Sequence, residues 1–462
     1  MTAPSFRLVR ARVPQHGNDT TETTIEVRDG RIAAVGTGAV AGLPDVDAQG
    51  AWVLPGAIDG HVHFDEPGFT HREDFLSGTR AAAAGGVTTV VDMPCTSLPP
   101  VVDAPAFEAK LAVIRHRAHV DFALWGGVRG NEFDVRLVEQ KLSELAALGV
   151  RSIKTYLISG MATYEDLDRS ELEVVMRCAA NLDLVVGVHA EDRDMIAAAS
   201  VRERNTPKGH TAQAYARVRS AQAEERGVQT CLEIAEATGA RLHIVHLACR
   251  GGLDRIREAR ARGVRVTVET CPHYLQFTLD DLVRLGSRLK TAPVVKSEAD
   301  RQALWEGLAD GTIDMVATDH APGQWPEEKS TGSFWSDYGG VPGVELMLSY
   351  LLSEGVAKGR LTLERAVQLV SAGPSRVHRL GPAKGSLMAG ADADLVLFDP
   401  HARWTVRADE LVTRQKYTPF EGLTLTGRVL RTYVRGNLVF DRSRGIVGHP
   451  SGQIVAHMPL SA

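Results

Sequence analysis

Cysteine is scarce in this sequence, and its pattern excludes two common roles for a thiol. The chain has 462 residues and five cysteines: Cys95, Cys178, Cys231, Cys249 and Cys271. They are odd in number and show no Cys-x-x-Cys spacing, so neither a disulfide framework nor a thiolate zinc site is indicated. We expect the thiols to be reduced and mostly buried.

Long apolar runs and concentrated positive charge are also missing. No segment reaches the roughly 18 uninterrupted apolar residues that span a bilayer, and the N-terminal MTAPSFRLVR lacks the apolar core of a signal peptide. The formal net charge is −5, and basic residues cluster only in short helical stretches such as 255–265. This balance gives no electrostatic basis for binding nucleic acid. We therefore expect a cytoplasmic protein that binds neither membranes nor nucleic acid.

The central region, residues 55–380, alternates short apolar runs with amphipathic helical stretches. Eight such units fit a (β/α)8 TIM barrel better than an open doubly wound sheet, which typically has fewer strands and a dinucleotide fingerprint. We therefore expect an α/β fold with its barrel over 55–380. The strand candidates are the run at 53–63, VTTVVDMP, HVDFALWGGV, VRSIKTYLI, LDLVVGVHA, ARLHIVHLA, VRVTVETCP and IDMVATDHAP.

Both ends of the chain are predicted to contain short strands. Residues 1–54 include TTIEVRDGRIAAVG, in which Asp29-Gly30 predicts a tight hairpin. Residues 381–462 include ADADLVLFD and GRVLRTYVRGNLVFD, with a turn at Arg435-Gly436-Asn437. Because the two ends share this pattern, we expect them to form one small β-sandwich domain around the inserted barrel. The glycine-rich stretch 36–42 lacks the Lys-Ser/Thr of a phosphate-binding loop and predicts an ordinary loop.

Polar residues close several of the predicted barrel strands. In a barrel, catalytic groups lie at the carboxyl ends of strands, where loops build the active face. A single histidine at such a place is more often a hydrogen-bonded core residue, whereas polar groups at five strand ends predict one shared site. His61 and His63 are also one residue apart, so in a strand they project to the same face. The candidates are His61, His63, Lys154, His189, His246 and Asp319.

These residue types make chemical sense around a pair of divalent metal ions. Imidazole nitrogens and a carboxylate suit Zn2+, with Mn, Co and Fe as alternatives. Two cations close together need an anion between them, and a deprotonated lysine supplies one by adding carbon dioxide to form a carbamate. Burial of a lysine lowers its pKa, as this reaction requires. The alternative for Lys154 is a salt bridge.

Taken together, these motifs resemble the cyclic amidohydrolase branch of the amidohydrolase superfamily, which includes allantoinases, dihydroorotases, hydantoinases and dihydropyrimidinases. The resemblance implies a (β/α)8 barrel with a flanking β-sandwich, and hydrolytic opening of a cyclic amide, imide or ureide. Members of the branch commonly assemble as dimers or tetramers, so a homo-oligomer is expected. The matching segments are PGAIDGHVHFDEPG, DFLSGTRAAAAGGVTTVVDMP, SIKTY, GVHAED, IVHLA, VETCPHYL and ATDHAPG.

The resemblance also implies a role for each candidate ligand. His61 and His63 would bind one ion, and Asp319 would contact that ion. The other ion would lie on His189 and His246, and N6-carboxylated Lys154 would bridge the two. Asp319 is the expected catalytic base: it takes a proton as water attacks and passes it to the departing ring nitrogen. His320, the next residue, is either a supporting group or a packing residue.

Two positions bear on the choice of substrate. Dihydroorotases typically carry Arg where this chain has Asp65 and Asn where it has Cys95, and both of those residues help to hold a substrate carboxylate. Asp65 would instead repel an anionic substrate in a partly dry site. Asp65 and Cys95 are thus candidate substrate-binding residues, and the favoured reaction is hydrolysis of allantoin, a neutral ring, to allantoate.

Other activities stay open from the sequence. A dihydroorotase, a hydantoinase or a dihydropyrimidinase would share the ligand set, and so would a hydrolase of an ester or phosphoester. A catalytically weak dihydroorotase relative that serves as an assembly partner usually has lost metal ligands, whereas this chain keeps all of them. The segment 323–345, rich in Gly, Pro and aromatic residues, is expected to be a mobile substrate loop.

Overall fold

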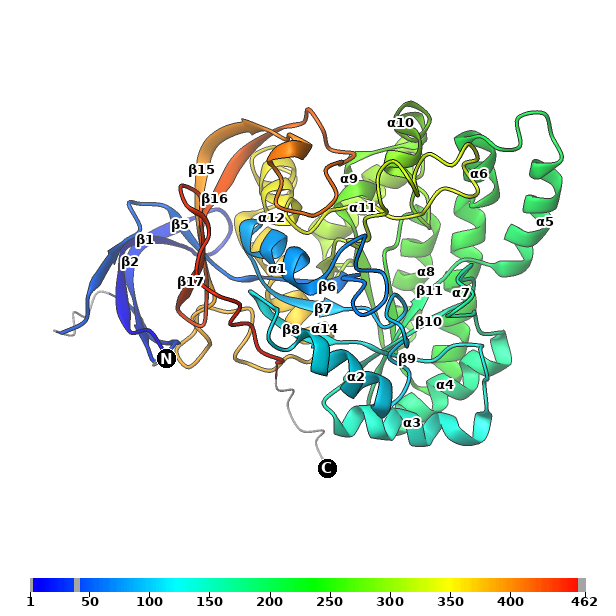
Figure 1. Ribbon diagram of the computed structural model, residues 1–462, viewed down its shortest axis with the longest axis horizontal. Helices are drawn as coiled ribbons and strands as arrows, with labels where there is room; N and C mark the ends of the chain where they lie inside the picture. The colour runs from blue at the N-terminus through cyan, green and yellow to red at the C-terminus, as the bar shows by residue number, and fades with distance from the viewer. Residues whose placement is uncertain (1–2, 37–41, 456–462) are drawn as a thin grey trace.

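A computed structural model of the chain describes residues 3–36 and 42–455 and shows two adjoining parts (Figure 1). Strands from both ends of the chain form a large sheet, and beside it lies a barrel of parallel strands wrapped by helices. The prediction of an α/β fold with a TIM barrel and a flanking β-sandwich is confirmed. Most of the loop predicted at 36–42 lies outside the described residues.

The terminal sheet has nine strands, in the order β18-β17-β16-β15-β5-β1-β2-β3 with β4 paired to β1. Antiparallel pairing of β5 with β15 joins the first part of the chain to the last. Both predicted hairpins are present: Asp29-Gly30 and Arg435-Gly436 connect paired strands with positive φ, as a type I′ turn requires. The strands are β1 (Phe6–Pro14), β2 (Thr20–Arg28), β3 (Arg31–Gly36), β4 (Asp45–Asp47), β5 (Trp52–Pro55), β15 (Leu395–Thr405), β16 (Thr424–Val434), β17 (Asn437–Asp441) and β18 (Gly445–Ile446).

The barrel is built from the eight apolar runs that the sequence predicts as strands. Neighbouring strands pair in parallel, and a bridge between Val62 and His320 joins the end of β6 to the segment after β14. Nearly all side chains of these strands are buried, which explains why they appear as continuous apolar runs. The strands are β6 (Ala57–Val62), β7 (Val87–Asp92), β8 (Asp121–Leu124) with its continuation β9 (Gly126–Gly127), β10 (Ser152–Tyr156), β11 (Val185–His189), β12 (Arg241–Ile244), β13 (Val266–Thr270) and β14 (Met315–Val316).

Helices cover the outside of the barrel and begin at residues that can cap them. Asp74, Asp168 and Ser297 each form a capping box that satisfies the first backbone donors of a helix. The α-helices are α1 (Phe75–Ala84), α2 (Ala104–Ile114), α3 (Val135–Ala147), α4 (Arg169–Asn181), α5 (Arg193–Arg204), α6 (Ala212–Val218), α7 (Ala221–Thr238), α8 (Arg250–Ala261), α9 (Pro272–Gln276), α10 (Leu279–Leu285), α11 (Glu298–Asp310), α12 (Met347–Tyr350), α13 (Leu363–Val370) and α14 (Ala372–Val377). Two short 3-10 helices are η1 (Gly286–Leu289) and η3 (Ala408–Glu410), and η2 (Leu351–Val356) is a π-helix that continues α12.

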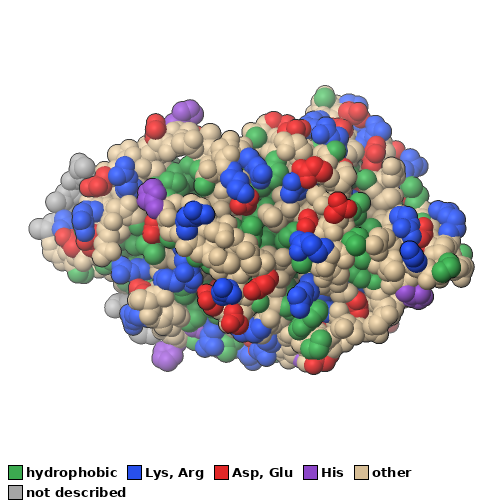
Figure 2. Space-filling model, turned by 90° about the horizontal axis from the view of Figure 1, so that it is seen from above, with side chains coloured by type: hydrophobic (Ala, Val, Ile, Leu, Met, Phe, Trp, Pro, Cys, Tyr) green, Lys and Arg blue, Asp and Glu red, His purple; other side chains and the backbone are tan. Residues whose placement is uncertain are grey.

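The outer surface carries both signs of charge. In Figure 2, basic and acidic side chains are interspersed over the visible face. No helix in the described ranges is both long and apolar enough to cross a membrane.

We propose that the chain divides at about residues 54/55 and 380/381, with residues 1–54 and 381–462 as the β-sandwich domain and 55–380 as the barrel domain. The proposal is supported by the pairing of β5 with β15 and by a separate apolar core inside the terminal sheet, which includes Leu8, Ile25 and Leu395. Limited proteolysis with mass spectrometry would test the second junction, because cleavage should then fall in the exposed residues 388–390, whereas the first junction lies in buried backbone.

Candidate functional site

Two histidines and an aspartate meet at the carboxyl ends of the first and last barrel strands. His61 lies in β6, His63 follows it, and Asp319 follows β14. Asp319 Oδ1 is 3.2 Å from His61 Nε2 and 3.1 Å from His63 Nε2. Burial raises the pKa of Asp319, but the charge of His61 and the hydrogen bond from His63 outweigh it and bring the pKa to about 2. The three side chains therefore offer two nitrogens and an ionised oxygen to one point.

Two more histidines form a second group beside the first. His189 closes β11 and His246 follows β12, and the distance from His189 Nδ1 to His246 Nε2 is 3.1 Å. The His61 and His246 ring centroids are 5.4 Å apart, so the two groups adjoin. Both histidines are almost fully buried. The structure thus brings together four histidines from three distant parts of the chain.

Lys154 completes the set from β10. Its side chain is fully buried, and Nζ has no hydrogen-bond partner among the described residues. Nζ lies 4.5 Å from the centroid of the Tyr156 ring. Burial lowers the pKa of Lys154 to about 8, against the pull of acidic groups that include Asp319 and Glu269. The salt bridge considered as the alternative is not formed within the described part of the chain.

A buried carboxylate fixes the orientation of His61. Glu269 in β13 accepts a hydrogen bond from His61 Nδ1 at 2.5 Å and lies 3.1 Å from His243 Nε2. The same carboxylate accepts the backbone N–H of His246 at 3.1 Å. Because His61 Nδ1 is hydrogen-bonded to Glu269, Nε2 is the ring nitrogen that faces Asp319 and the site.

A second carboxylate does the same for His189. Glu191 Oε2 is 2.8 Å from His189 Nε2, which leaves Nδ1 directed at His246. Asp59 in β6 plays a related part for the last strand, since it accepts the backbone N–H of Thr318 at 3.0 Å. Glu269, Glu191 and Asp59 are not among the residues predicted from the sequence. The available signal was a carboxylate inside or directly beyond an apolar run, in AIDGHV, VVGVHAE and VTVET.

His320 proves to be a supporting group. Its Nδ1 accepts the backbone N–H of Gly343 at 3.1 Å, so its Nε2 is the protonated nitrogen and lies 3.3 Å from Glu73 Oε2. Thr413 Oγ1 donates to the same Glu73 oxygen at 2.8 Å. His320 thereby links the strand end that carries Asp319 to the segments that contain Gly343 and Glu73.

Residues 411–418, which we call the strap, reach from the terminal sheet across the loops of the active face. Gln415 Nε2 donates to the carbonyl oxygen of His71 at 2.9 Å, in the loop after β6. Tyr417 OH accepts the backbone N–H of Gly323 at 3.1 Å, in the loop after β14. The strap therefore fastens the loops beyond the first and last barrel strands.

The site opens into a cavity of about 530 Å3. Its walls include Tyr156 and Ile158 beyond β10, Ile196 in α5, and Trp335 and Tyr338 from the segment 323–345. Aromatic residues of that segment thus line the same cavity as the histidines. The volume is within the usual range for a small-molecule site.

Three cationic side chains also line this cavity. Arg219 forms an ion pair with the buried Glu191. Lys290 donates to the backbone carbonyl oxygens of Trp335, at 3.3 Å, and Asp337. Arg204 is exposed at the mouth, with its guanidinium carbon 4.3 Å from the Trp335 ring centroid.

The two candidate substrate-binding residues lie behind the cavity wall. Asp65 and Cys95 are 0% and 1% exposed, and neither is among the described residues that line the cavity. Cys95 Sγ lies 3.1 Å from Tyr156 OH and 3.7 Å from His63 Nδ1. Burial raises the pKa of Asp65 to about 7, against the charge of His63. Their part in substrate binding stays a prediction. From these positions they would act on the substrate indirectly, through His63 and Tyr156.

The arrangement of donors fits a pair of divalent ions. In each group, one histidine is held by a hydrogen bond at the ring nitrogen that faces away from the site. His61 is held in this way by Glu269, and His189 by Glu191. Such bonds are typical of metal-binding imidazoles. The buried Nζ of Lys154 has no hydrogen-bond partner among the described residues, and its conversion to a carbamate would give it the character of a metal ligand.

Comparison with known proteins places the chain in a family. The profile of the amidohydrolase family matches residues 52–439. An allantoinase of Rubrobacter xylanophilus is 41% identical over 434 residues, 93% of each chain. An L-hydantoinase of Paenarthrobacter aurescens is 34% identical over 448 residues, 96% of each chain. Among solved structures, the L-hydantoinase (dihydropyrimidinase) from Arthrobacter aurescens superposes with a TM-score of 0.92 at 31% identity, over 99% of this chain and 100% of that one.

A barrel of this kind, with histidines and an aspartate at its strand ends, is typical of a metal-dependent enzyme. The chain belongs to the amidohydrolase family, within its cyclic amidohydrolase branch. It is accordingly a hydrolase of the C–N bonds of cyclic amides, which confirms the resemblance seen in its motifs.

Proposed function

We propose that this protein is a binuclear-metal hydrolase that opens a neutral cyclic ureide, with allantoin to allantoate as the first candidate reaction. The observation that supports it most is that four imidazoles and Asp319 converge close to Lys154, whose buried Nζ has no hydrogen-bond partner among the described residues. Several allantoinases among the relatives, at 31–41% identity, support the choice of ring. A hydantoin is the next substrate to consider, because relatives named as hydantoinases are similar over nearly the whole chain.

The residues at the strand ends would hold the two ions in separate positions. His61, His63 and Asp319 would hold one ion, and His189 and His246 the other, with Lys154 between them as its N6-carbamate. Zinc is the first candidate, with Mn, Co and Fe as alternatives. When bound, such ions lower the pKa of water and polarise a carbonyl group.

Asp319 moves the proton in the proposed reaction. Its carboxylate is ionised near neutrality and faces the cavity, so it can accept a proton from the attacking water. As the C–N bond of the ring breaks, Asp319 gives this proton to the departing nitrogen. The carbonyl carbon becomes a carboxylic acid, which loses the second water proton to solvent and ends as a carboxylate. Glu269, 2.5 Å from His61 Nδ1, keeps the nearby imidazole in the required tautomer.

Dihydroorotate is a second candidate substrate because of one observation. Arg204 stands exposed at the cavity mouth, where a guanidinium could pair with a substrate carboxylate. The raised pKa of Asp65 weakens the repulsion that this residue would otherwise exert on an anion. The neutral ring is still favoured, because Asp65 takes the position where dihydroorotases typically have Arg.

Turnover of a substrate panel tests the proposal. Metal-reconstituted protein is assayed on allantoin, hydantoin, dihydrouracil and dihydroorotate at one pH, with bound metal counted in the same sample. We expect kcat/KM for allantoin to exceed that for dihydroorotate at least about tenfold, or roughly 1.4 kcal/mol. Preference for dihydroorotate, lost in Arg204→Gln, would replace the proposal with the second candidate. Sedimentation of the same sample would show whether the chain forms the expected dimer or tetramer.

A further inference from the structure

A chain of buried charges extends behind His189. Glu191 is fully buried, and a single oxygen, Oε2, contacts both His189 Nε2, at 2.8 Å, and the guanidinium of Arg219. The Arg219 side chain is 11% exposed, so this pair is largely shielded from water. The imidazole proton of His189 therefore points at a carboxylate whose own place is set by Arg219.

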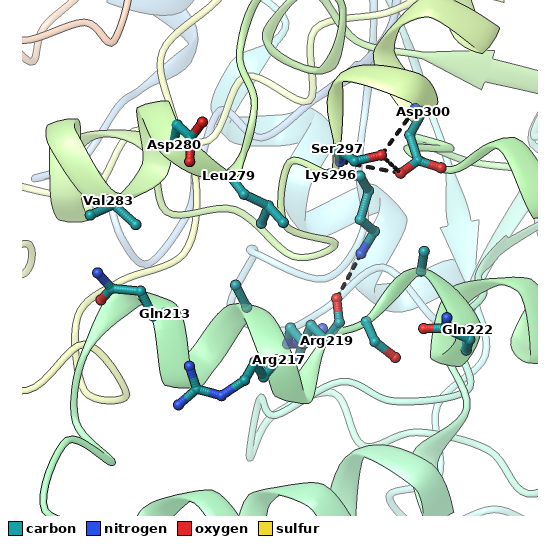
Figure 3. A pocket seen from close by; sticks show the side chains of 13 residues that line it. Gln213, Arg217, Arg219, Gln222, Leu279, Asp280, Val283, Lys296, Ser297 and Asp300 are labelled. Atoms are coloured by element: carbon teal, nitrogen blue, oxygen red, sulfur yellow. Dashed lines mark hydrogen bonds between the residues drawn. The ribbon is translucent and has the colours of Figure 1, made fainter.

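Arg219 is held in turn from the opposite side. Lys296 Nζ donates to the backbone carbonyl oxygen of Arg219 at 2.7 Å, as Figure 3 shows, and lies 3.4 Å from Glu224 Oε2. Glu224 Oε1 accepts the backbone N–H of Ala248 at 2.7 Å. Ala248 is two residues beyond His246, so the series of contacts that starts at His189 ends beside the other histidine of the same group.

Tight packing leaves this network little freedom. Gly227 in α7 faces the backbone of Ala190 and Glu191, where an added Cβ would lie 2.5 Å from the carbonyl carbon of Ala190. The helix thus approaches the His189 segment more closely than a larger residue would allow. Arg219 lines both the active-site cavity and a lateral cavity of about 500 Å3 (Figure 3). Arg219 therefore borders both cavities.

We propose that Glu191 and Arg219 are positioning residues for the His189–His246 half of the site. Glu191 sets the tautomer and direction of His189, and Arg219 holds Glu191 in place. Lys296 and Glu224 link Arg219 to the segment that carries His246. The inference rests on the proposed function, since it takes the two histidine groups to be two metal positions. It predicts that damage to the network empties one position and spares the one formed by His61 and His63.

The test counts metal ions rather than turnover. Wild-type protein and Arg219→Met are reconstituted with Zn2+, dialysed and measured for zinc per chain, and each is then titrated with a competing chelator. We expect about two ions in wild type and about one tightly held ion in Arg219→Met, with affinity at the weaker position lowered about 10- to 100-fold. Arg219→Lys keeps the charge without the planar fork and should recover part of that loss.

Arg217→Met is the matched control. Arg217 lies in α6, two residues before Arg219, and pairs with Glu203 at 2.7 Å on the surface. It should bind zinc as wild type does. If Arg219→Met fails to fold, Glu191→Gln, which keeps the side-chain volume, is measured in its place. It should also bind about one zinc ion per chain tightly.

The outcomes separate the inference from the function on which it rests. Two zinc ions of wild-type affinity in Arg219→Met, or in Glu191→Gln where Arg219→Met does not fold, overturn the positioning role. Equal weakening of both ions also overturns it, since the network would then act on the whole site. Fewer than two ions in wild type would instead refute the binuclear function itself.

Discussion

Lys384 offers the sharpest test of how the two parts of the molecule are joined. Its Nζ lies 2.5 Å from Asp121 Oδ2, 3.1 Å from Asp392 Oδ2 and 2.7 Å from Asp394 Oδ2. Asp121 begins β8 of the barrel, whereas the other residues belong to the segment that leads into β15. All four side chains are at least largely buried. One ammonium group therefore contacts carboxylates from both parts, while Arg435 also pairs with Asp121 and Arg31 lies 3.5 Å from Asp392.

Lys384→Met keeps most of the apolar stem and removes this charge. Removing one partner of a buried ion pair typically lowers the free energy of unfolding by about 3–5 kcal/mol, because the charge that remains is buried without that partner. At an unfolding entropy of about 2.1 cal/mol/K per residue, this corresponds to a fall in Tm of about 3–5 °C for a chain of this length that unfolds as one unit.

The loss should depend on pH in a defined direction. Burial lowers the pKa of Lys384, but the charges of Asp394 and Asp392 outweigh it, and the pKa is raised in the folded protein. Its contribution is therefore complete below the ordinary lysine pKa and disappears only as pH rises through the raised value. Without Lys384, the carboxylates repel one another and protonation relieves them. The Tm difference should thus shrink as pH falls from 8 to 5.5.

Scanning calorimetry at pH 5.5, 7 and 8 would measure these shifts. Arg177→Met, which breaks an exposed pair with Glu173, is the control and should change stability by about 1 kcal/mol or less. Ca2+ should raise the Tm of Lys384→Met and leave wild type unchanged, because the three carboxylates then offer a site for a cation. A Tm within 1 °C of wild type at pH 7 would refute the reasoning, and so would a loss that is the same at every pH.

Three substitutions at the site give further expectations. Lys154→Ala should lose most bound metal and activity, and a small added carboxylic acid should restore part of both, as measured by metal analysis and turnover. Asp319→Asn keeps an oxygen ligand and loses the base, so kcat should fall roughly 100-fold or more while much of the metal remains. Glu269→Gln replaces one carboxylate oxygen with an NH2 group, so one of the buried groups now bonded to Glu269 loses its acceptor. Metal affinity should therefore fall about 10- to 100-fold in a chelator titration.

Each of these expectations has an outcome that would contradict it. Full metal content and near-normal turnover in Lys154→Ala would mean that no carbamate bridge is needed. Retained turnover in Asp319→Asn would show that another group moves the proton. For Glu269→Gln, zinc affinity equal to that of wild type would show that His61 keeps its orientation without the carboxylate. Unfolding curves of the metal-free proteins serve as the control for general destabilisation.

The strands and the histidines could be predicted from the sequence for one physical reason. Strands buried on both faces appear as short continuous apolar runs, and the carboxyl ends of parallel barrel strands meet on one face. Once His61, His189 and Asp319 were placed at such ends, their proximity followed. The structure agrees, with Asp319 3.2 Å from His61.

The supporting carboxylates could not be found in this way. Glu269 and Glu191 matter because of which ring nitrogen they face, and that depends on side-chain direction across neighbouring segments rather than on sequence spacing. His320 shows the same limit, since its partner Glu73 comes from the segment that caps α1. Asp65 differs again: its position in the sequence suggested a place beside the substrate, whereas its burial depends on how the loop after β6 folds back.

The strap has a consequence for how such proteins can be recombined. The loops beyond the first and last barrel strands are fastened by Gln415 and Tyr417, which lie in the part of the chain that returns to the terminal sheet. The mouth of the barrel is therefore finished by a segment that a barrel alone would not contain. A chimera that exchanges the terminal sheet between two relatives would also exchange this fastening, and with it the shape of the opening. Substrate range in such chimeras should then follow the donor of the strap, even when every histidine comes from the other parent.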